Sequence, residues 1–145
     1  MSRLRISLRD AAATLRLGGA MASCLALRPG FALLLDGCLG AGKTTLVRGL
    51  VSPLPGGDEA EVASPSFNIC NMYPTAPQVA HFDLYRLEGQ PPGEDFENAL
   101  DAPETLVIVE WSQYLHPPDL PTERVTCLLT ALEEGRTADL TATCE

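Results

Sequence analysis

Apolar and polar residues follow two periodicities along the chain, one typical of strands and the other of helices. Residues 1–9 alternate basic and apolar side chains and predict a strand. Residues 11–27 have the spacing of an amphipathic helix, with Asp10 as its N-cap. The apolar face of this helix contains Ala11, Leu15, Ala22 and Leu25. Gly18 and Gly19 weaken its middle and predict a bend or a break.

Runs rich in aliphatic, aromatic and β-branched residues predict further strands at 31–35, 67–73, 79–85, 106–111, 124–130 and 137–143. The second and third runs are joined by a short proline-rich link, which predicts an antiparallel hairpin. Residues 44–51 predict a helix that ends near Ser52 and Pro53, because proline has no N–H group to donate. Residues 94–100 predict a short helix.

The segment between the strand at 31–35 and the helix at 44–51 is rich in glycine. It fits the phosphate-binding loop pattern G-x-x-x-x-G-K-[ST] as Gly37-Cys38-Leu39-Gly40-Ala41-Gly42-Lys43-Thr44. Such a loop turns backbone N–H groups toward an anion, and the helix N-terminus adds partial positive charge. Lys43, the only lysine in the chain, would reach the β- and γ-phosphates, and Thr44 would ligate Mg²⁺. The alternative interpretation is a glycine turn before an ordinary helix.

Two apolar strands deliver a carboxylate at their ends, Asp83 after residues 79–82 and Glu110 after residues 106–109. Phosphate-loop enzymes use such acids to hold Mg²⁺ directly or through water. The alternative is a surface acid at a strand end. His81 shares a strand face with Asp83 and is a candidate to orient that carboxylate, or a structural histidine with satisfied hydrogen bonds.

Ser64-Pro65-Ser66 lies some twenty residues after the loop, where many such proteins have a switch segment. The hydroxyls of Ser64 and Ser66 are candidates to sense the γ-phosphate or its metal. The alternative is an ordinary Ser-Pro turn.

Length and composition limit the class of protein. A chain of 145 residues favours a single domain, residues 1–145. Its net charge of −9 argues against a broad surface that grips RNA or DNA, so any link to nucleic acid is expected to be indirect. Five scattered cysteines without C-x-x-C spacing predict reduced thiols. With no signal-peptide core and no apolar run long enough for a membrane span, we expect a cytoplasmic protein.

The ordered motifs of the chain resemble those of the bacterial TsaE family, the ATPase component of the system that makes threonylcarbamoyladenosine in tRNA. The motifs that carry the resemblance are Gly-Cys-Leu-Gly-Ala-Gly-Lys-Thr-Thr at 37–45, Ser-Pro-Ser-Phe at 64–67, His-Phe-Asp-Leu-Tyr-Arg-Leu at 81–87, Val-Glu-Trp at 109–111 and Gly-Arg at 135–136. The resemblance spans nearly the whole chain, and the motifs at 81–87 and 109–111 are more specific than the phosphate loop.

The resemblance implies an α/β fold, a phosphate-loop NTPase-like three-layer arrangement with a mixed parallel and antiparallel central sheet. It also implies hydrolysis of ATP with Mg²⁺, coupled to a two-protein transferase complex of TsaB and TsaD type that acts on tRNA. Lys43, Asp83 and Glu110 would be catalytic, and Thr44, Asp83 and Glu110 would hold the metal. The nucleotide would be bound by Gly37, Leu39, Gly40, Ala41, Gly42, Lys43, Thr44, Thr45, Ala11, Gly135, Arg136 and Trp111.

This chain departs from the family pattern in three places. Cys38 stands where the family usually has aspartate, so a negative group near the phosphates and metal is missing. Ser66 replaces the usual threonine and keeps a hydroxyl. Residues 89–102 lack the leucine- and glutamate-rich pattern of relatives, which puts a partner-docking role for them in question.

Two other functions fit the same loop. A small-molecule kinase would need an acceptor pocket and usually a lid with several arginines, and no arginine cluster follows the loop in the sequence. A nucleotide-sensing adapter would bind nucleotide without hydrolysis, with Cys38 marking the loss of activity. The arginine that stabilises the leaving charge would be Arg86 or would come from a partner.

Overall fold

The computed structural model describes residues 2–25, 31–38, 40–65, 68–87, 90–102 and 104–143. Within these residues the strands are β1 (Ser2–Leu8), β2 (Ala32–Gly37), β3 (Cys70–Tyr73), β4 (Gln78–Asp83), β5 (Thr105–Glu110), β6 (Arg124–Ala131) and β7 (Arg136–Thr143). The helices are α1 (Ala11–Leu25), α2 (Lys43–Val51) and α3 (Glu94–Asp101). Short 3₁₀ helices lie at Gly57–Glu59, Tyr85–Leu87, Ser112–Tyr114 and Pro117–Asp119.

The described strands form one mixed sheet in the order β1-β7-β6-β2-β5-β4-β3. The four central strands, β6, β2, β5 and β4, are parallel, while β1 with β7, β7 with β6, and β3 with β4 are antiparallel. The predicted β3–β4 hairpin is therefore confirmed. Parallel strands end at one edge of the sheet, and this edge is where α/β proteins bind ligands. Asp36 and Gly37 of β2, Asp83 of β4 and Glu110 of β5 lie there.

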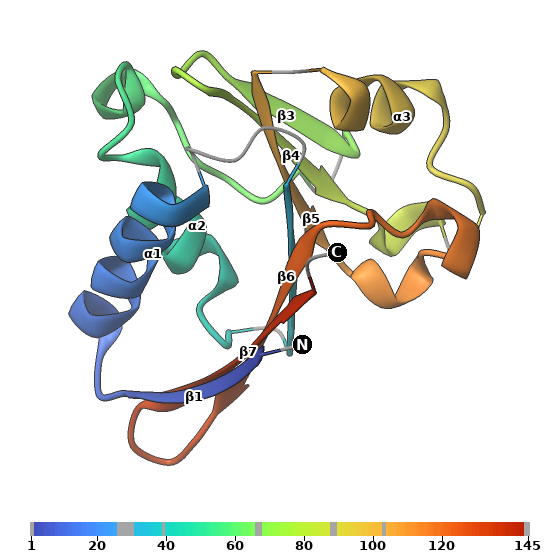
Figure 1. Cartoon of the computed structure of the whole chain (residues 1–145). Helices are drawn as coiled ribbons and strands as arrows, with labels where there is room; N and C mark the ends of the chain where they lie inside the picture. The colour runs from blue at the N-terminus through green and yellow to red at the C-terminus, as the bar shows by residue number, and fades with distance from the viewer. Residues whose placement is uncertain are drawn as a thin grey trace.

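The sheet lies between two layers, as Figure 1 shows. Helices α1 and α2 cover one face through a core that includes Leu33, Leu35, Leu46 and Ile108. Helix α3 and the 3₁₀ segments after β5 pack on the other face, where Phe82 and Phe96 meet edge to face at 5.2 Å between ring centroids. The central strands β2 and β5 are buried on both faces, which explains their continuous apolar runs.

The break predicted as one outcome for the first helix does not occur, since α1 runs continuously through Gly18 and Gly19. Gly18 instead permits a close approach to α2. A Cβ atom on Gly18 would lie 2.7 Å from Leu50 N, and one on Gly49 would lie 2.8 Å from Leu15 Cα. Either separation is too short for a real side chain, so the two glycines fix how tightly the helices pack.

The predicted apolar face of α1 was partly wrong for the same reason. Ala11 and Leu15 are exposed, whereas the buried residues are Thr14, Gly18, Met21 and Ala22. The face of α1 that contacts α2 needs small residues such as Thr14 and Gly18. The spacing of apolar residues alone therefore places the buried face of α1 about one position away from its true location. Asp10 is the N-cap as predicted, because its Oδ1 accepts the Ala13 N–H at 2.8 Å.

For three strands, the predicted range extends beyond the observed strand at one end. β4 ends at Asp83 and β5 at Glu110, so Tyr85 and Trp111 belong to the following turns. β3 begins only at Cys70, and the predicted strand residue Phe67 lies outside the described residues. None of the helices described here combines the length and apolar character needed to cross a membrane.

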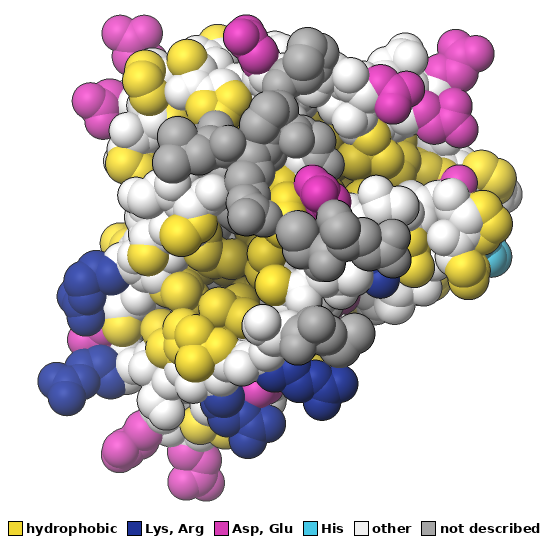
Figure 2. Space-filling view, viewed as in Figure 1, with side chains coloured by type: hydrophobic (Ala, Val, Ile, Leu, Met, Phe, Trp, Pro, Cys, Tyr) yellow, Lys and Arg dark blue, Asp and Glu magenta, His cyan; other side chains and the backbone are white. Residues whose placement is uncertain are grey.

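Charged side chains are distributed unevenly on the face shown in Figure 2. Most basic side chains on this face lie in its lower half, around β1 and the beginning of α1, while many acidic ones lie along the upper edge. The arginines near the beginning of α1 include Arg9 and Arg16, which both line a pocket described below. Basic side chains therefore gather near the carboxyl edge of the sheet, where acidic side chains also lie.

Candidate active site

The phosphate loop connects the end of β2 to the beginning of α2 at the carboxyl edge of the sheet. Gly40 and Gly42 have left-handed φ angles of 81° and 103°, which a side chain would strain. Helix α2 begins at Lys43, so Thr44 and Thr45 lie in its first turn, where the helix presents unpaired N–H groups. Leu39 lies outside the described residues. The glycine-rich turn and the helix start therefore lie where the sequence predicts them, in a geometry that can present N–H groups to an anion.

Lys43 is held inside this loop by protein groups. Its Nζ donates a hydrogen bond to Gly37 O at 2.8 Å and lies 3.9 Å from Glu110 Oε1. The ammonium also lies 5.0 Å from the ring centroid of Trp111, within the range of a cation–π contact. With 11% of its side chain exposed, Lys43 presents one localised positive charge to the space above the loop.

Asp83 and Glu110 are brought together as predicted, because β4 and β5 are adjacent parallel strands in which these two residues are paired. The Ser64 hydroxyl lies between the two carboxylates, 3.1 Å from Asp83 Oδ2 and 3.4 Å from Glu110 Oε2. Asp83 Oδ1 accepts the Tyr85 N–H at 3.0 Å. Both carboxylates are buried, with relative exposures of 8% and 2%. Ser66, the second predicted switch residue, lies outside the described residues.

His81 contacts a different carboxylate from the one that strand alternation suggested. Its Nε2 is hydrogen-bonded to Glu110 Oε2 at 2.6 Å, across the β4–β5 pair, and no hydrogen bond to Asp83 is recorded among the described residues. Its Nδ1 lies 3.0 Å from the Tyr73 hydroxyl. Burial raises the pKa of Tyr73, which keeps this hydroxyl protonated at neutral pH. His81 is thus a fully bonded buried histidine that also touches the candidate site.

Asp36 lies at the end of β2 beside the candidate site and was not among the residues predicted from the sequence. Its Oδ1 accepts the Ser112 N–H at 2.9 Å, and its Oδ2 accepts the Ser112 hydroxyl at 2.6 Å. The signal was present, because Asp36 ends an apolar strand in the same way as Asp83 and Glu110. These bonds tie the end of β2 to the turn after β5, where Trp111 has a left-handed backbone (φ 59°, ψ 42°).

A pocket of about 1070 Å³ opens above the loop and the carboxylates. It is lined by Cys38, Gly40, Gly42, Lys43, Thr44, Thr45, Ser64, Asp83, Tyr85, Arg86, Glu110, Trp111 and Arg136. The other two described loop residues contribute carbonyls, since Gly37 O accepts from Lys43 and Ala41 O accepts from Arg136 Nη1 at 3.0 Å. Trp111 is flanked by Tyr85 and Tyr114, with ring centroids 4.8 and 6.0 Å away. The pocket thus joins basic, acidic and aromatic groups around the glycine-rich loop.

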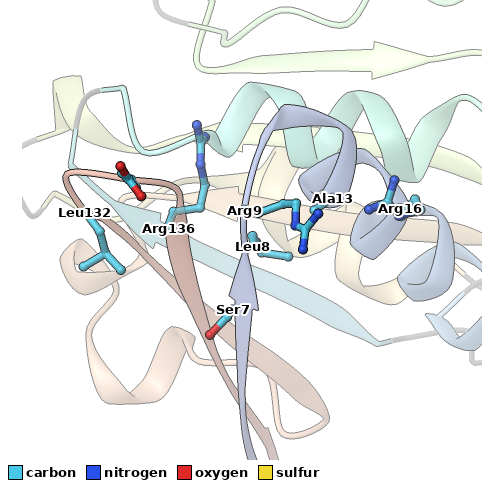
Figure 3. Close-up of a pocket in the computed structure, with 8 residues that line it drawn as sticks. Ser7, Leu8, Arg9, Ala13, Arg16, Leu132 and Arg136 are labelled. Carbon is cyan, nitrogen blue, oxygen red and sulfur yellow. The ribbon is translucent and has the colours of Figure 1, made fainter.

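A second pocket of about 460 Å³ lies between the end of β1, the beginning of α1 and the β6–β7 turn (Figure 3). Its lining residues are Ser7, Leu8, Arg9, Ala13, Arg16, Leu132, Glu134 and Arg136. Arg136 lines both pockets, and its Nε has no hydrogen-bond partner within the described residues. On α1 the lining residues are Ala13 and Arg16, whereas the predicted Ala11 is exposed at the helix start. Gly135, at φ 75°, lets the turn approach the end of β1, because a Cβ there would lie 2.5 Å from Leu8 O.

The donor set determines which metal fits. Over the described part of the chain, no group of three His, Cys, Asp or Glu side chains is placed to hold a metal ion. Thr44, Asp83 and Glu110 line the large pocket instead. This set suits Mg²⁺, which usually keeps several waters and takes one or two carboxylates together with substrate phosphates.

Comparison with known proteins decides the family. The family model of the threonylcarbamoyl adenosine biosynthesis protein TsaE matches residues 8–138. The chain belongs to the TsaE family. A TsaE relative from Nostoc, a tRNA threonylcarbamoyladenosine biosynthesis protein, is 36% identical over 143 residues, or 94% of this chain and 85% of the relative.

Two more TsaE relatives carry the same description. The protein from Synechocystis is 39% identical over 80% of this chain and 73% of its own length, and that from Streptomyces coelicolor is 40% identical over 60% of each. The crystal structure of Bacillus subtilis YdiB superposes with a TM-score of 0.76 at 23% identity, covering 99% of this chain and 87% of that one. The predicted α/β fold with a mixed sheet is therefore confirmed.

Proposed function

We propose that this TsaE-family protein binds Mg·ATP and hydrolyses it during the biosynthesis of threonylcarbamoyladenosine in tRNA, resetting a two-protein transferase complex of TsaB and TsaD type between turnovers. One observation carries the proposal. The Ser64 hydroxyl lies between the Asp83 and Glu110 carboxylates, and Lys43 Nζ lies 3.9 Å from Glu110, all in the pocket above the phosphate loop. Phosphoryl transfer to water needs this combination of an anion cradle, a cation and carboxylates.

The positions of the two pockets indicate how the nucleotide would be oriented. The large pocket would take the phosphates, with Lys43 and the first turn of α2 as donors. The smaller pocket, with Leu8, Ala13 and Leu132 beside Arg9 and Arg16, would take the base. Arg136 lines both pockets and has an unused buried donor, so it would contact the sugar or the phosphate nearest to it.

The residues present fit one magnesium ion on the nucleotide. Thr44, Asp83 and Glu110 would hold it directly or through water, and it would supply neutralisation of charge on the β- and γ-phosphates. In the protein itself, Asp83 and Glu110 accept hydrogen bonds and can orient the attacking water. When the nucleotide binds, Lys43 Nζ would donate its hydrogen bond to a phosphate oxygen in place of Gly37 O. The positive charge of Lys43 would then stabilise the ligand.

Ser64 would couple the state of the bound nucleotide to the partner complex. Its hydroxyl carries a single hydrogen and lies near both carboxylates, so a change in their ligands changes which bond it makes. Residues 62–65 form no helix or strand, and Ser64 is their link to the carboxylates, so this segment would move when the link changes. We propose this as the switch that the partner complex senses.

The arginine that stabilises the leaving charge is either Arg86, which lines the large pocket, or an arginine of a partner protein. If Arg86 acts in this way, Arg86→Ala lowers partner-stimulated turnover by about 10³-fold. Unchanged stimulated turnover in the variant excludes Arg86 and assigns the role to the partner.

The decisive measurement is phosphate release from Mg·ATP by the purified protein, alone and with the two candidate partner proteins. Asp83→Ala and Glu110→Ala serve as variants that remove one carboxylate each. Weak release alone, strong stimulation by the partners and loss of both in each variant would support the proposal. A failure of the partners to stimulate any release contradicts the coupled ATPase.

The same assay separates the two other functions. Tight nucleotide binding without release in any mixture would favour the adapter, for which the exposed Cys38 in the loop is the supporting observation. Nucleotide turnover that yields a phosphorylated small molecule rather than free phosphate would favour a kinase.

A further inference from the structure

His81 is a buried polar side chain to which the proposed hydrolysis assigns no task. Its relative exposure is 0%, and both ring nitrogens have partners, Glu110 Oε2 at 2.6 Å and the Tyr73 hydroxyl at 3.0 Å. Tyr73 and Glu110 are almost as deeply buried, at 3% and 2%. The three side chains therefore form a deeply buried hydrogen-bonded chain from β3 through β4 to β5, which reaches the large pocket at Glu110.

The bond from His81 is the shortest that Glu110 makes in the described structure. The Ser64 hydroxyl is 3.4 Å from the same Oε2 atom, and Lys43 Nζ is 3.9 Å from Oε1. A buried carboxylate follows its shortest hydrogen bond, because a charge-assisted bond of this length is stronger and more directional than the longer contacts. His81 thus holds Oε2 on the protein side and leaves Oε1 on the side of Lys43 and the pocket.

Tyr73 in turn fixes the His81 ring. A histidine bonded at one nitrogen can still rotate, whereas bonds at both nitrogens define the plane of the ring. The Tyr73 hydroxyl also lies 3.0 Å from Ala63 O and accepts the Ala63 N–H at 3.3 Å. One hydroxyl therefore anchors both the His81 ring and the residue next to Ser64.

We propose that His81, held by Tyr73, is a positioning residue that fixes Glu110 Oε1 toward the metal and the phosphates, through the buried chain Tyr73–His81–Glu110. The proposal rests on the proposed function in that it names the support of the carboxylate used there. It adds that the β3–β4 hairpin at the edge of the sheet sets the geometry of both Glu110 and the Ser64 segment.

The test removes single links of the chain. Tyr73→Phe keeps the ring and deletes the hydroxyl, His81→Asn keeps a group near Tyr73 that is too short to reach Glu110, and His81→Gln restores a donor near the Nε2 position. Met72→Ala is the matched control, because Met72 precedes Tyr73 on β3, its side chain is exposed and it lies outside the chain to Glu110.

We expect Tyr73→Phe and His81→Asn to lower kcat of partner-stimulated phosphate release by about tenfold and to raise the Mg²⁺ concentration for half-maximal rate, as loss of support behind a metal-binding carboxylate usually does. Binding of ADP without Mg²⁺ should change less than about twofold, because that contact uses the loop. His81→Gln should recover part of kcat, and Met72→Ala should stay close to wild type. Equal loss of ADP affinity in all variants, or a loss of kcat in Met72→Ala as large as in Tyr73→Phe, overturns the proposal.

A crystallographic readout separates this proposal from the proposed function. In Tyr73→Phe we expect Glu110 Oε1 to move away from Lys43 Nζ relative to wild type, whether or not the protein hydrolyses ATP. An unmoved carboxylate contradicts the positioning role. Absence of hydrolysis in the wild type, with a displaced carboxylate in the variant, contradicts the proposed function alone.

Discussion

Asp36 and Ser112 join two strand ends through a double hydrogen bond, in which one carboxylate accepts both the backbone N–H and the hydroxyl of one serine. Asp36 is the last residue before Gly37 of the phosphate loop, and Ser112 follows Trp111. The pair therefore fixes the left-handed turn at Trp111, a conformation that costs a bulky residue about 1 to 3 kcal/mol. This turn places the indole ring beneath the Lys43 ammonium.

Ser112→Ala should release this turn. The variant loses a hydrogen bond of 2.6 Å to a carboxylate, so we expect about 2 kcal/mol lower stability and a melting temperature about 6 °C lower. Trp111 is the only tryptophan, so intrinsic fluorescence reports the turn directly, and its emission maximum should shift. Gln113→Ala, at an exposed neighbouring position, is the control. Wild-type emission and stability in Ser112→Ala would show that the hydroxyl does not hold the turn.

Gly18→Ala should destabilise the α1–α2 contact, because the new methyl group would collide with the backbone of Leu46 and Leu50. Overpacking of this kind costs about 1 to 3 kcal/mol and outweighs the gain of about 1 kcal/mol in helix propensity. Gly19→Ala is the matched control. Its Cβ would meet only Gly49 O at 3.8 Å, so this variant should be as stable as wild type or more so. Urea denaturation of both measures the difference, and an equal effect at the two positions would contradict the packing argument.

Cys38→Asp tests whether the cysteine limits turnover. Cys38 is exposed at the large pocket, so an aspartate there would add a negative group near the metal and the attacking water. We expect kcat for phosphate release to rise about threefold or more, equal to about 0.7 kcal/mol of activation barrier, with half-maximal rate at lower Mg²⁺. Cys24→Asp, at an exposed position on α1, should have no such effect. Unchanged activity in Cys38→Asp would contradict the hypothesis that Cys38 limits turnover.

Two thiols with raised pKa values, one buried and one half-buried, predict lower stability at alkaline pH. Burial raises the pKa of Cys127 from 9.0 to about 12 and that of Cys70 to about 11. These thiols ionise in the unfolded chain from about pH 9 but remain protonated when folded, so the stability present below pH 9 is lost as pH rises toward 12. For Cys127 alone the loss between pH 7 and pH 10 is about 1.4 kcal/mol.

The measurement for this prediction is urea denaturation at pH 7 and pH 10. Cys127→Ala should reduce the loss of stability between the two pH values, although its stability is lower at both because a core side chain is shortened. Cys24→Ser, which alters an exposed thiol, should leave the loss unchanged. The same pH dependence in Cys127→Ala as in wild type would contradict the assignment.

Local pattern was sufficient for much of the fold and for the location of the candidate site. An apolar strand ending in an acid predicts a carboxylate at the sheet edge, and the structure pairs Asp83 with Glu110 there. Asp36 satisfies the same rule, since it follows the apolar residues of β2, but it was not among the predicted residues. The glycine loop followed by a helix ending near Pro53 needed no tertiary information, because both signals are local.

Features that depend on contacts between distant segments were not predictable from spacing. The partner of His81 is set by the register of β4 and β5, and alternation can give only the face on which His81 lies. Gly18 looked like a helix breaker because propensity describes an isolated helix, whereas its role depends on Gly49 thirty-one residues later. Arg136 lies beside Ala41 because the sheet order places β7 near the loop, which no local pattern contains.

The close glycine contact between α1 and α2 also fixes the distance between the beginnings of the two helices. The beginning of α1 lines the small pocket through Ala13 and Arg16, and the beginning of α2 lines the large one through Lys43, Thr44 and Thr45. Because the helices touch backbone to backbone near Gly18 and Gly49, the span between the pockets is set by main-chain packing rather than by adjustable side chains. A ligand that occupies both pockets is therefore selected by its length as well as by its charge.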